Sequence, residues 1–216
     1  DLDEAVIGAM ANKYRNSGQV CVSANRIYVH ENIYDEFSNR LAEKSSQLKV
    51  ADGRTEGSQI GPLITPQAFK KVEEHVEDAV EKGAKILTGG TSDNSGVQFY
   101  KPTVLTDINN NMQIYYEETF GPVAPIIKFM DENEVIEMAN DTKYGLAGYF
   151  YGRDIGKIWR VAEALEYGMV GINAGVISTE VAPFGGIKES GIGREGAEEG
   201  IEEYLETKYL CFDGVE

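Results

Sequence analysis

The sequence TPQAFKKVEEHVEDAVEKGAKILT, residues 65–88, contains the pattern that decides the fold. Thr65 can cap a helix whose first turn starts at Pro66. Apolar side chains then recur at helical spacing until Gly83, which ends the helix. They are Phe69, Val72, Val76, Ala79 and Val80. Lys85–Thr88 follows directly as a strand, and a helix that leads into a strand is the unit of an α/β fold.

The same alternation continues in both directions along the chain. Apolar residues at helical spacing predict a helix that begins near Leu2 and stops at Gly18. They also predict a second helix, from Ile33 to about Leu48, which Asn32 can cap. Further helices are predicted at Glu132–Ala139 and Asp154–Tyr167. The predicted strands are Arg26–His30, Thr103–Thr106, Ala124–Phe129, Leu146–Tyr151 and Met169–Ile172. We therefore predict an α/β domain with a mostly parallel, helix-covered sheet, followed by a strand-like segment at Glu203–Phe212.

Charge excludes some classes of partner. The 216 residues carry 20 Lys and Arg against 36 Asp and Glu, which gives a net charge of −16. Such a field repels phosphate backbones and anionic lipid surfaces, so we expect no nucleic-acid partner and no membrane partner. No apolar run approaches the ~20 residues of a membrane span, and the acidic start does not resemble a secretory signal.

The two cysteines, Cys21 and Cys211, are too far apart in sequence for a disulfide framework or a zinc site, so no metal is predicted. A reducing, cytoplasmic setting is expected. Because the chain has no Met at position 1 and opens within a predicted helix, we expect it to be an excerpt of a longer protein.

Cys21 lies in the segment NSGQVCVSAN, residues 16–25, at a glycine-containing break after the first helix. A free cysteine is most often a small buried hydrophobe, and Cys211 fits that interpretation. A nucleophilic thiol must reach its thiolate form, which nearby positive charge or amide dipoles favour. Arg15 and Arg26 flank Cys21 in sequence. The position of Cys21 after a helix therefore makes it the candidate nucleophile.

Two further motifs could surround a ligand. EETFGP, residues 117–122, is either a solvated turn or a carboxylate and an aromatic ring placed to bind a ribose and a flat group. PFGGIKESGIGREG, residues 183–196, matches a dinucleotide fingerprint by its glycine spacing, but no strand is predicted before it and no βαβ unit after it. A glycine-rich loop at the mouth of an active site is the better interpretation.

Neither histidine is expected to be catalytic. His30 ends a predicted strand, and His75 lies among Glu73, Glu74 and Glu77, which is typical of a solvated helix face. No spacing supports a Cys/His hydrolase dyad.

The three motifs around Cys21, Glu118 and Glu195 together resemble the aldehyde dehydrogenase superfamily, in order and in spacing, over essentially the whole chain. Within it, KYRNSGQVC (residues 13–21), NAGVIS (173–178) and EYLETKYLC (203–211) are most similar to succinate-semialdehyde dehydrogenases.

The resemblance implies roles for six residues and a cofactor, NAD or NADP. Cys21 would attack an aldehyde to give a thiohemiacetal and then a thioester. Cofactor-binding residues would be Glu118, for the ribose, and Phe120, near the nicotinamide. Glu195 would help to relay protons, and Arg15 and Ser178 would bind a distal carboxylate of the aldehyde substrate.

The resemblance also implies a domain organisation. Residues 1–202 would form the catalytic domain and residues 203–216 an oligomerisation segment, so a homo-oligomer is expected. The family's cofactor-binding domain and its water-activating glutamate precede the nucleophile, and only 20 residues do so here. The isolated fragment is therefore expected to be inactive. Ser23 replaces a second cysteine that some relatives carry.

Three alternatives stay open at this point. The chain could belong to a dehydrogenase for another aldehyde, because Arg15 and Ser178 are only moderately specific. It could be a thiol esterase, since an acylated Cys21 could turn over activated esters. The fragment alone could also be an inactive binding or structural domain.

Overall fold

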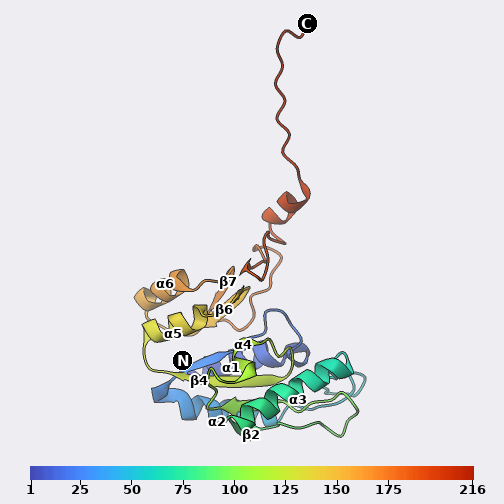
Figure 1. Cartoon of the computed structure of the whole chain (residues 1–216), viewed down its shortest axis with the longest axis vertical. Helices are drawn as coiled ribbons and strands as arrows, with labels where there is room; N and C mark the ends of the chain where they lie inside the picture. The colour runs from blue at the N-terminus through green and yellow to red at the C-terminus, as the bar shows by residue number, and fades with distance from the viewer.

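A computed structural model describes residues 1–216 and contains a main sheet of four strands in the order β1-β4-β3-β2 (Figure 1). β1 (Ile27–His30), β4 (Val123–Phe129) and β3 (Thr103–Thr106) are parallel. β2 (Lys85–Thr88) pairs antiparallel with β3 at the edge. The prediction of a mostly parallel α/β sheet is therefore confirmed.

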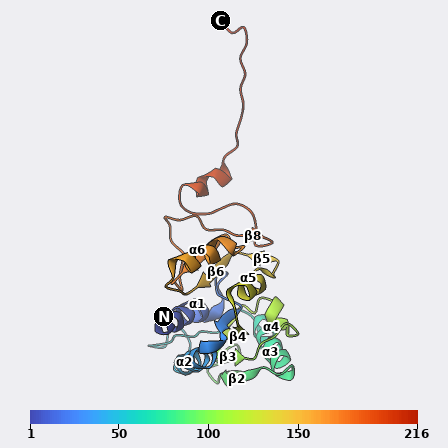
Figure 2. The ribbon, with the colours of Figure 1, turned by 90° about the vertical axis from the view of Figure 1, so that its left-hand side faces the viewer.

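Four more strands form two small sheets apart from the main one. β6 (Ala147–Phe150) is parallel to β7 (Met169–Ile172), and β5 (Tyr144–Gly145) is antiparallel to β8 (Ile187–Lys188). Figures 1 and 2 place the β6–β7 pair on the side of the main sheet nearest the C-terminal segment. β1 pairs only with β4, and β6 only with β7, so each has one free edge.

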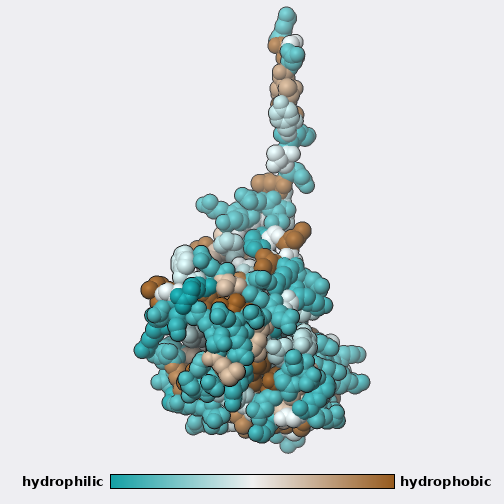
Figure 3. Space-filling view, turned by 60° about the vertical axis from the view of Figure 1, so that its left-hand side comes forward, coloured by the Kyte–Doolittle hydropathy of each residue, from teal (hydrophilic) through white to brown (hydrophobic).

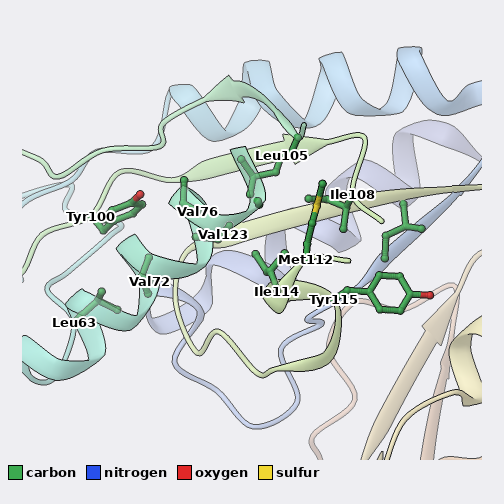
Figure 4. Packing of buried hydrophobic residues seen from close by; sticks show 13 residues of the cluster. Leu63, Val72, Val76, Tyr100, Leu105, Ile108, Met112, Ile114, Tyr115 and Val123 are labelled. Carbon is green, nitrogen blue, oxygen red and sulfur yellow. The ribbon is translucent and has the colours of Figure 1, made fainter. Parts of the chain in front are cut away.

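Helices cover both faces of the main sheet. α3 (Pro66–Glu81) covers one face, and α1 (Leu2–Tyr14) and α2 (Tyr34–Ser46) cover the other. β4 supplies both cores by alternation: Val123 and Ile127 join the cluster under α3, which Figure 4 shows, while the side chains of Ala124 and Ile126 join the cluster under α1 and α2.

Of the two helix caps predicted from the sequence, Thr65 and Asn32, only the Thr65 cap is formed. The Thr65 hydroxyl accepts a hydrogen bond from the Ala68 amide, as predicted. Asp131 caps α5 (Glu132–Asn140) and Asp154 caps α6 (Ile155–Ala164). The Asn32 cap is wrong: His30 caps the short 3₁₀ turn η2 (Glu31–Ile33), and α2 begins after it with no side-chain cap.

The buried face of α3 differs from the predicted one. Val72, Val76 and Ala79 are buried as expected, but Val80 is 41% exposed and His75 is only 2% exposed. The buried stripe is thus Val72, His75, Val76 and Ala79, which is the i, i+3, i+4, i+7 spacing. The expectation of a solvated His75 is wrong because its helix position, and not its charged neighbours, decides its surroundings.

The C-terminal segment projects from the body. After η3 (Glu199–Tyr204), residues 205–216 are exposed and have no secondary structure (Figures 1 and 3). The strand expected near Glu203–Phe212 is therefore not formed in the single chain. Apolar side chains on it, such as Tyr209 and Phe212, are exposed. Cys211 is exposed as well, so the expectation of a buried cysteine there is wrong. No helix of the chain has the length and apolar character that crossing a membrane requires.

Candidate active site

Cys21 is exposed on a turn that follows α1 and the 3₁₀ segment η1 (Arg15–Gly18). Three consecutive residues in η1 have left-handed backbone, with φ of 50° at Asn16, 59° at Ser17 and 74° at Gly18. The Ser17 hydroxyl is 3.0 Å from both the carbonyl oxygen and the amide nitrogen of Gly61. This sharp reversal ends α1 and presents the thiol to solvent.

The EETFGP loop packs directly against this turn. A Cβ on Gly18 would lie 2.1 Å from the carbonyl oxygen of Gly121, so the two backbones meet where no other residue fits. The Thr119 amide donates a 3.1 Å hydrogen bond to Oδ1 of Asn25. Phe120 is 36% exposed and has a φ of 52°. Two motifs about a hundred residues apart in sequence thus form one local structure.

Cys21 and Glu118 line the same cleft, which has a volume of about 290 Å³. Tyr149 and Tyr167 form part of its wall. Burial raises the pKa of Tyr149 to about 12, although the Asn12 side chain and the Arg15 charge act in the opposite direction. A thiol, a carboxylate and aromatic walls are therefore gathered in one concave place, which suits a small ligand.

The other predicted site residues lie outside the lining of this cleft. Arg15 is exposed at the first position of η1, and Ser178 is exposed in the loop after β7. Phe120 is two residues from Glu118 in the same loop. The functional roles of all these residues stay predictions.

The glycine-rich loop reaches the cleft only through Ser190. The amide of Glu195 donates to the Phe184 carbonyl, and its own carbonyl accepts from the Phe184 amide, which closes the loop. One expectation needs correction, because the two-residue strand β8 does precede Gly191. β8 is antiparallel to β5 and no parallel βαβ unit follows, so the dinucleotide fingerprint is still not formed here.

Arg26 lines the cleft together with Cys21, and its guanidinium is anchored at the end of α5. Its guanidinium donates to the carbonyl oxygens of Met138 and Ala139, both at 2.9 Å, at the end of α5. It also lies over the Tyr28 ring, 5.5 Å from the centroid. Its main contacts therefore stabilise the C-terminus of α5.

Lys13 and Asn12 hold the backbone of the turn that carries Cys21, and neither was predicted from the sequence. The Nζ of Lys13 donates to the Ala24 carbonyl at 2.9 Å, and the side chain is almost fully buried. Burial lowers the pKa of Lys13 to about 8, while the Glu118 carboxylate acts in the opposite direction. The sequence did indicate that Lys13 is buried, because it lies seven residues after Val6 and so shares the buried face of the helix.

His75 connects α3 to the EETFGP loop. Its Nδ1 is 3.1 Å from the Thr119 hydroxyl, and its Nε2 is 3.4 Å from a Glu117 carboxylate oxygen. Burial lowers the pKa of His75, and the hydrogen bond to Glu117 opposes that effect without cancelling it. The buried ring is therefore neutral near pH 7.

This environment predicts a pH dependence of stability. Below the ordinary histidine pKa of about 6.5, the unfolded chain takes up a proton before the folded chain does, so the free energy of unfolding should decline as the pH is lowered. His75→Gln should remove that part of the decline, whereas His30→Gln controls for the loss of a histidine in general. Urea unfolding between pH 7 and pH 5 measures the slopes, and equal slopes for all three proteins would contradict the account.

A larger cavity, of about 830 Å³, lies between the free edges of β1 and β6. α1, α5 and α6 also contribute to its mainly apolar wall. Neither Cys21 nor Glu118 lines it, but it adjoins the cleft of the candidate site, because residues such as Arg26, Tyr28 and Tyr149 line both.

The family model described as the aldehyde dehydrogenase family matches residues 1–210. The chain therefore belongs to the aldehyde dehydrogenase family.

Individual relatives refine this assignment. The chain is 56% identical to the NADP(+) succinate-semialdehyde dehydrogenase of Escherichia coli K12, over 98% of this chain and 44% of the relative. It is 59% identical to the glutarate-semialdehyde dehydrogenase of Pseudomonas putida KT2440, with the same shares covered. The crystal structure of a succinate-semialdehyde dehydrogenase from Burkholderia pseudomallei superposes with a TM-score of 0.96, at 57% identity, over 98% of this chain and 44% of that one. The chain thus spans less than half the length of these relatives.

Proposed function

We propose that this chain is the catalytic portion of a longer NAD(P)-dependent dehydrogenase that oxidises succinate semialdehyde to succinate. The observation that carries the proposal is the shared cleft of Cys21 and Glu118. The family membership and the names of the two relatives support it, because both relatives act on a semialdehyde with a distal carboxylate.

Cys21 supplies the nucleophile of the proposed reaction. Its thiolate attacks the aldehyde carbon, a C–S bond forms and the carbonyl oxygen becomes an oxyanion, which nearby amides can stabilise. A bound nicotinamide would supply the acceptor for the hydride that the thiohemiacetal carbon loses. The product on Cys21 is a thioester, and water then displaces the sulfur to release the carboxylic acid and regenerate the thiol.

Glu118 and Phe120 fit the nicotinamide end of the cofactor. The Glu118 carboxylate is exposed at the cleft, where it can accept hydrogen bonds from ribose hydroxyls. Phe120 has a partly exposed ring that can pack against a flat group. The close approach of Gly18 and Gly121 keeps both residues beside the Cys21 turn.

Two structural features support the view that the chain works as part of a larger protein. The free edges of β1 and β6 both border the 830 Å³ cavity, which is the arrangement expected where a further strand completes a sheet. The exposed apolar residues near Tyr209 favour association with another copy, so we propose a homo-oligomer built partly through residues 203–216. The fragment alone is expected to be inactive.

Arg15 is the proposed ligand of the substrate carboxylate, and Ser178 is proposed to add a hydroxyl hydrogen bond to it. A guanidinium binds a carboxylate through a bidentate, charge-assisted pair. Succinate and glutarate semialdehydes differ by one methylene, and both relatives fit this chemistry. The carboxylate contact therefore defines a substrate class, within which succinate semialdehyde is the proposed member.

Arg15→Ala should reduce kcat/KM for succinate semialdehyde by roughly 10–150-fold, the equivalent of about 1.5–3 kcal/mol. An uncharged aldehyde of similar length should lose far less. The assay uses an enzyme of the relatives' full length that contains these residues, with reduced nicotinamide as the readout. Arg54→Ala is the control, because Arg54 is an exposed arginine paired with Asp52. Equal losses for both aldehydes would show that Arg15 does not read the carboxylate.

A further inference from the structure

Two side chains in the last turn of α1 make hydrogen bonds to the turn that carries Cys21. The Nδ2 of Asn12 donates to the Val22 carbonyl at 3.1 Å. The Ala24 amide donates to Oδ1 of Asn12 at 2.7 Å, and Lys13 holds the Ala24 carbonyl. The backbone on the C-terminal side of the nucleophile is thus fixed by side chains instead of by regular secondary structure.

Asn12 also contacts the loop that follows β7. Its Nδ2 donates a second hydrogen bond, at 3.0 Å, to the carbonyl of Gly175, three residues before Ser178. A Cβ on Gly175 would lie 2.3 Å from the carbonyl oxygen of Gly8, so this loop lies directly against α1. The two donor hydrogens and the acceptor oxygen of one buried amide are all used between segments that are about 150 residues apart.

Tyr149, on β6, also donates a hydrogen bond to the Cys21 turn. Its hydroxyl donates to the Val22 carbonyl at 2.9 Å, so that oxygen accepts hydrogen bonds from both Asn12 and Tyr149. Removal of either donor still leaves the oxygen with a partner. Asn12 differs from Tyr149 because it alone joins the Cys21 turn to the Gly175 loop.

We propose that Asn12 is a positioning residue that fixes the Cys21 turn relative to the loop of Ser178. Aldehyde dehydrogenation by a thiol requires the aldehyde carbon to meet sulfur while the far end of the substrate is held, and small errors in such spacing reduce the rate. Asn12 touches neither the thiol nor the Ser178 hydroxyl, and it acts through backbone carbonyls. The catalytic consequence rests on the proposed function, whereas the placement itself does not.

Two substitutions distinguish the donor role of the Asn12 side chain from its acceptor role. Asn12→Leu removes every hydrogen bond, whereas Asn12→Asp keeps the acceptor for Ala24 but loses both donors. Tyr34→Phe is the matched control, because the Tyr34 hydroxyl also makes buried hydrogen bonds, to Ile126 and Asp107, away from the site. If Asn12 served only the stability of the whole chain, replacing it and replacing Tyr34 would loosen the same parts of the chain.

The experiment uses NMR on the 216-residue chain labelled with ¹⁵N. In Asn12→Leu the Ala24 amide should exchange with solvent roughly tenfold faster, and in Asn12→Asp less than about twofold faster. In both variants the order parameter of Gly175 should fall from the rigid range of about 0.85 to below about 0.6. Tyr34→Phe should change neither position.

The outcomes decide the proposal without reference to activity. Unchanged Ala24 exchange and Gly175 order in Asn12→Leu would overturn it, and so would equal loosening in Tyr34→Phe. If Asn12→Leu does not fold, Asn12→Asp still tests the contact with Gly175. In an enzyme of the relatives' length, Asn12→Asp should lower kcat/KM for the semialdehyde about tenfold and leave the KM for NAD(P)+ unchanged, and absence of turnover in the unsubstituted enzyme would fault the proposed function alone.

Discussion

Replacement of Cys21 by alanine should abolish both aldehyde oxidation and ester hydrolysis in an enzyme of the relatives' length, with a loss of at least about 10⁴-fold in kcat. Every covalent step of the proposed reaction needs this sulfur, and no other thiol is near the cleft. Cys211, the other cysteine, lies in the exposed C-terminal segment. Cys211→Ala is therefore the matched control.

Steady-state assays with NAD(P)+ and succinate semialdehyde, and separately with an activated ester, measure both activities. Cys211→Ala should retain nearly full activity. Substantial dehydrogenase turnover in Cys21→Ala would disprove the covalent mechanism. Retained dehydrogenase activity together with lost ester hydrolysis would show that the thiol serves only a side reaction.

Gly18→Ala should have the second-largest effect, and it acts on the fold. The new Cβ would lie 2.1 Å from the Gly121 oxygen and 2.5 Å from the Gly121 carbon. These are backbone atoms, so no side chain can move aside. The φ of 74° adds the usual cost of a left-handed residue. We expect a loss of at least about 3 kcal/mol in the free energy of unfolding.

Gly57 provides a closely matched control. It has the same φ of 74°, but its nearest neighbour to a new Cβ is the Lys49 side chain at 4.0 Å. Gly57→Ala therefore has the strain without the clash and should cost about 1 kcal/mol. Urea unfolding curves of both variants test the difference. Equal losses would contradict the close approach of the Cys21 turn and the EETFGP loop.

Local patterns predicted the regular elements well. The Thr65 cap, the Pro66 start and the strand at Lys85–Thr88 are all present at the predicted positions, because their signals lie within a few residues of one another. The error at His75 has a different origin. Three glutamates near it in sequence suggested solvent, but helix geometry aligns His75 with Val72 and Ala79 on the buried face.

The arrangement of strands and the support of the site could not be predicted in the same way. The free edges of β1 and β6 depend on which strands pair, and pairing is decided between segments far apart in sequence. Asn12 looks like an ordinary polar residue in a helix until Val22 and Gly175 are placed beside it. By contrast, the resemblance indicated Cys21 and Glu118 as site residues, and the structure brings them to one cleft.

The most direct test of the central claim is to identify the acylated residue during turnover. An enzyme of the relatives' length is mixed with NAD(P)+ and succinate semialdehyde, quenched in acid within the first turnover, digested and examined by mass spectrometry. A succinyl thioester is expected on the peptide that contains Cys21, none on the peptide that contains Cys211, and no succinyl thioester on either peptide when NAD(P)+ is omitted. Turnover without any acyl group on Cys21, or with the acyl group on another residue, would contradict the claim.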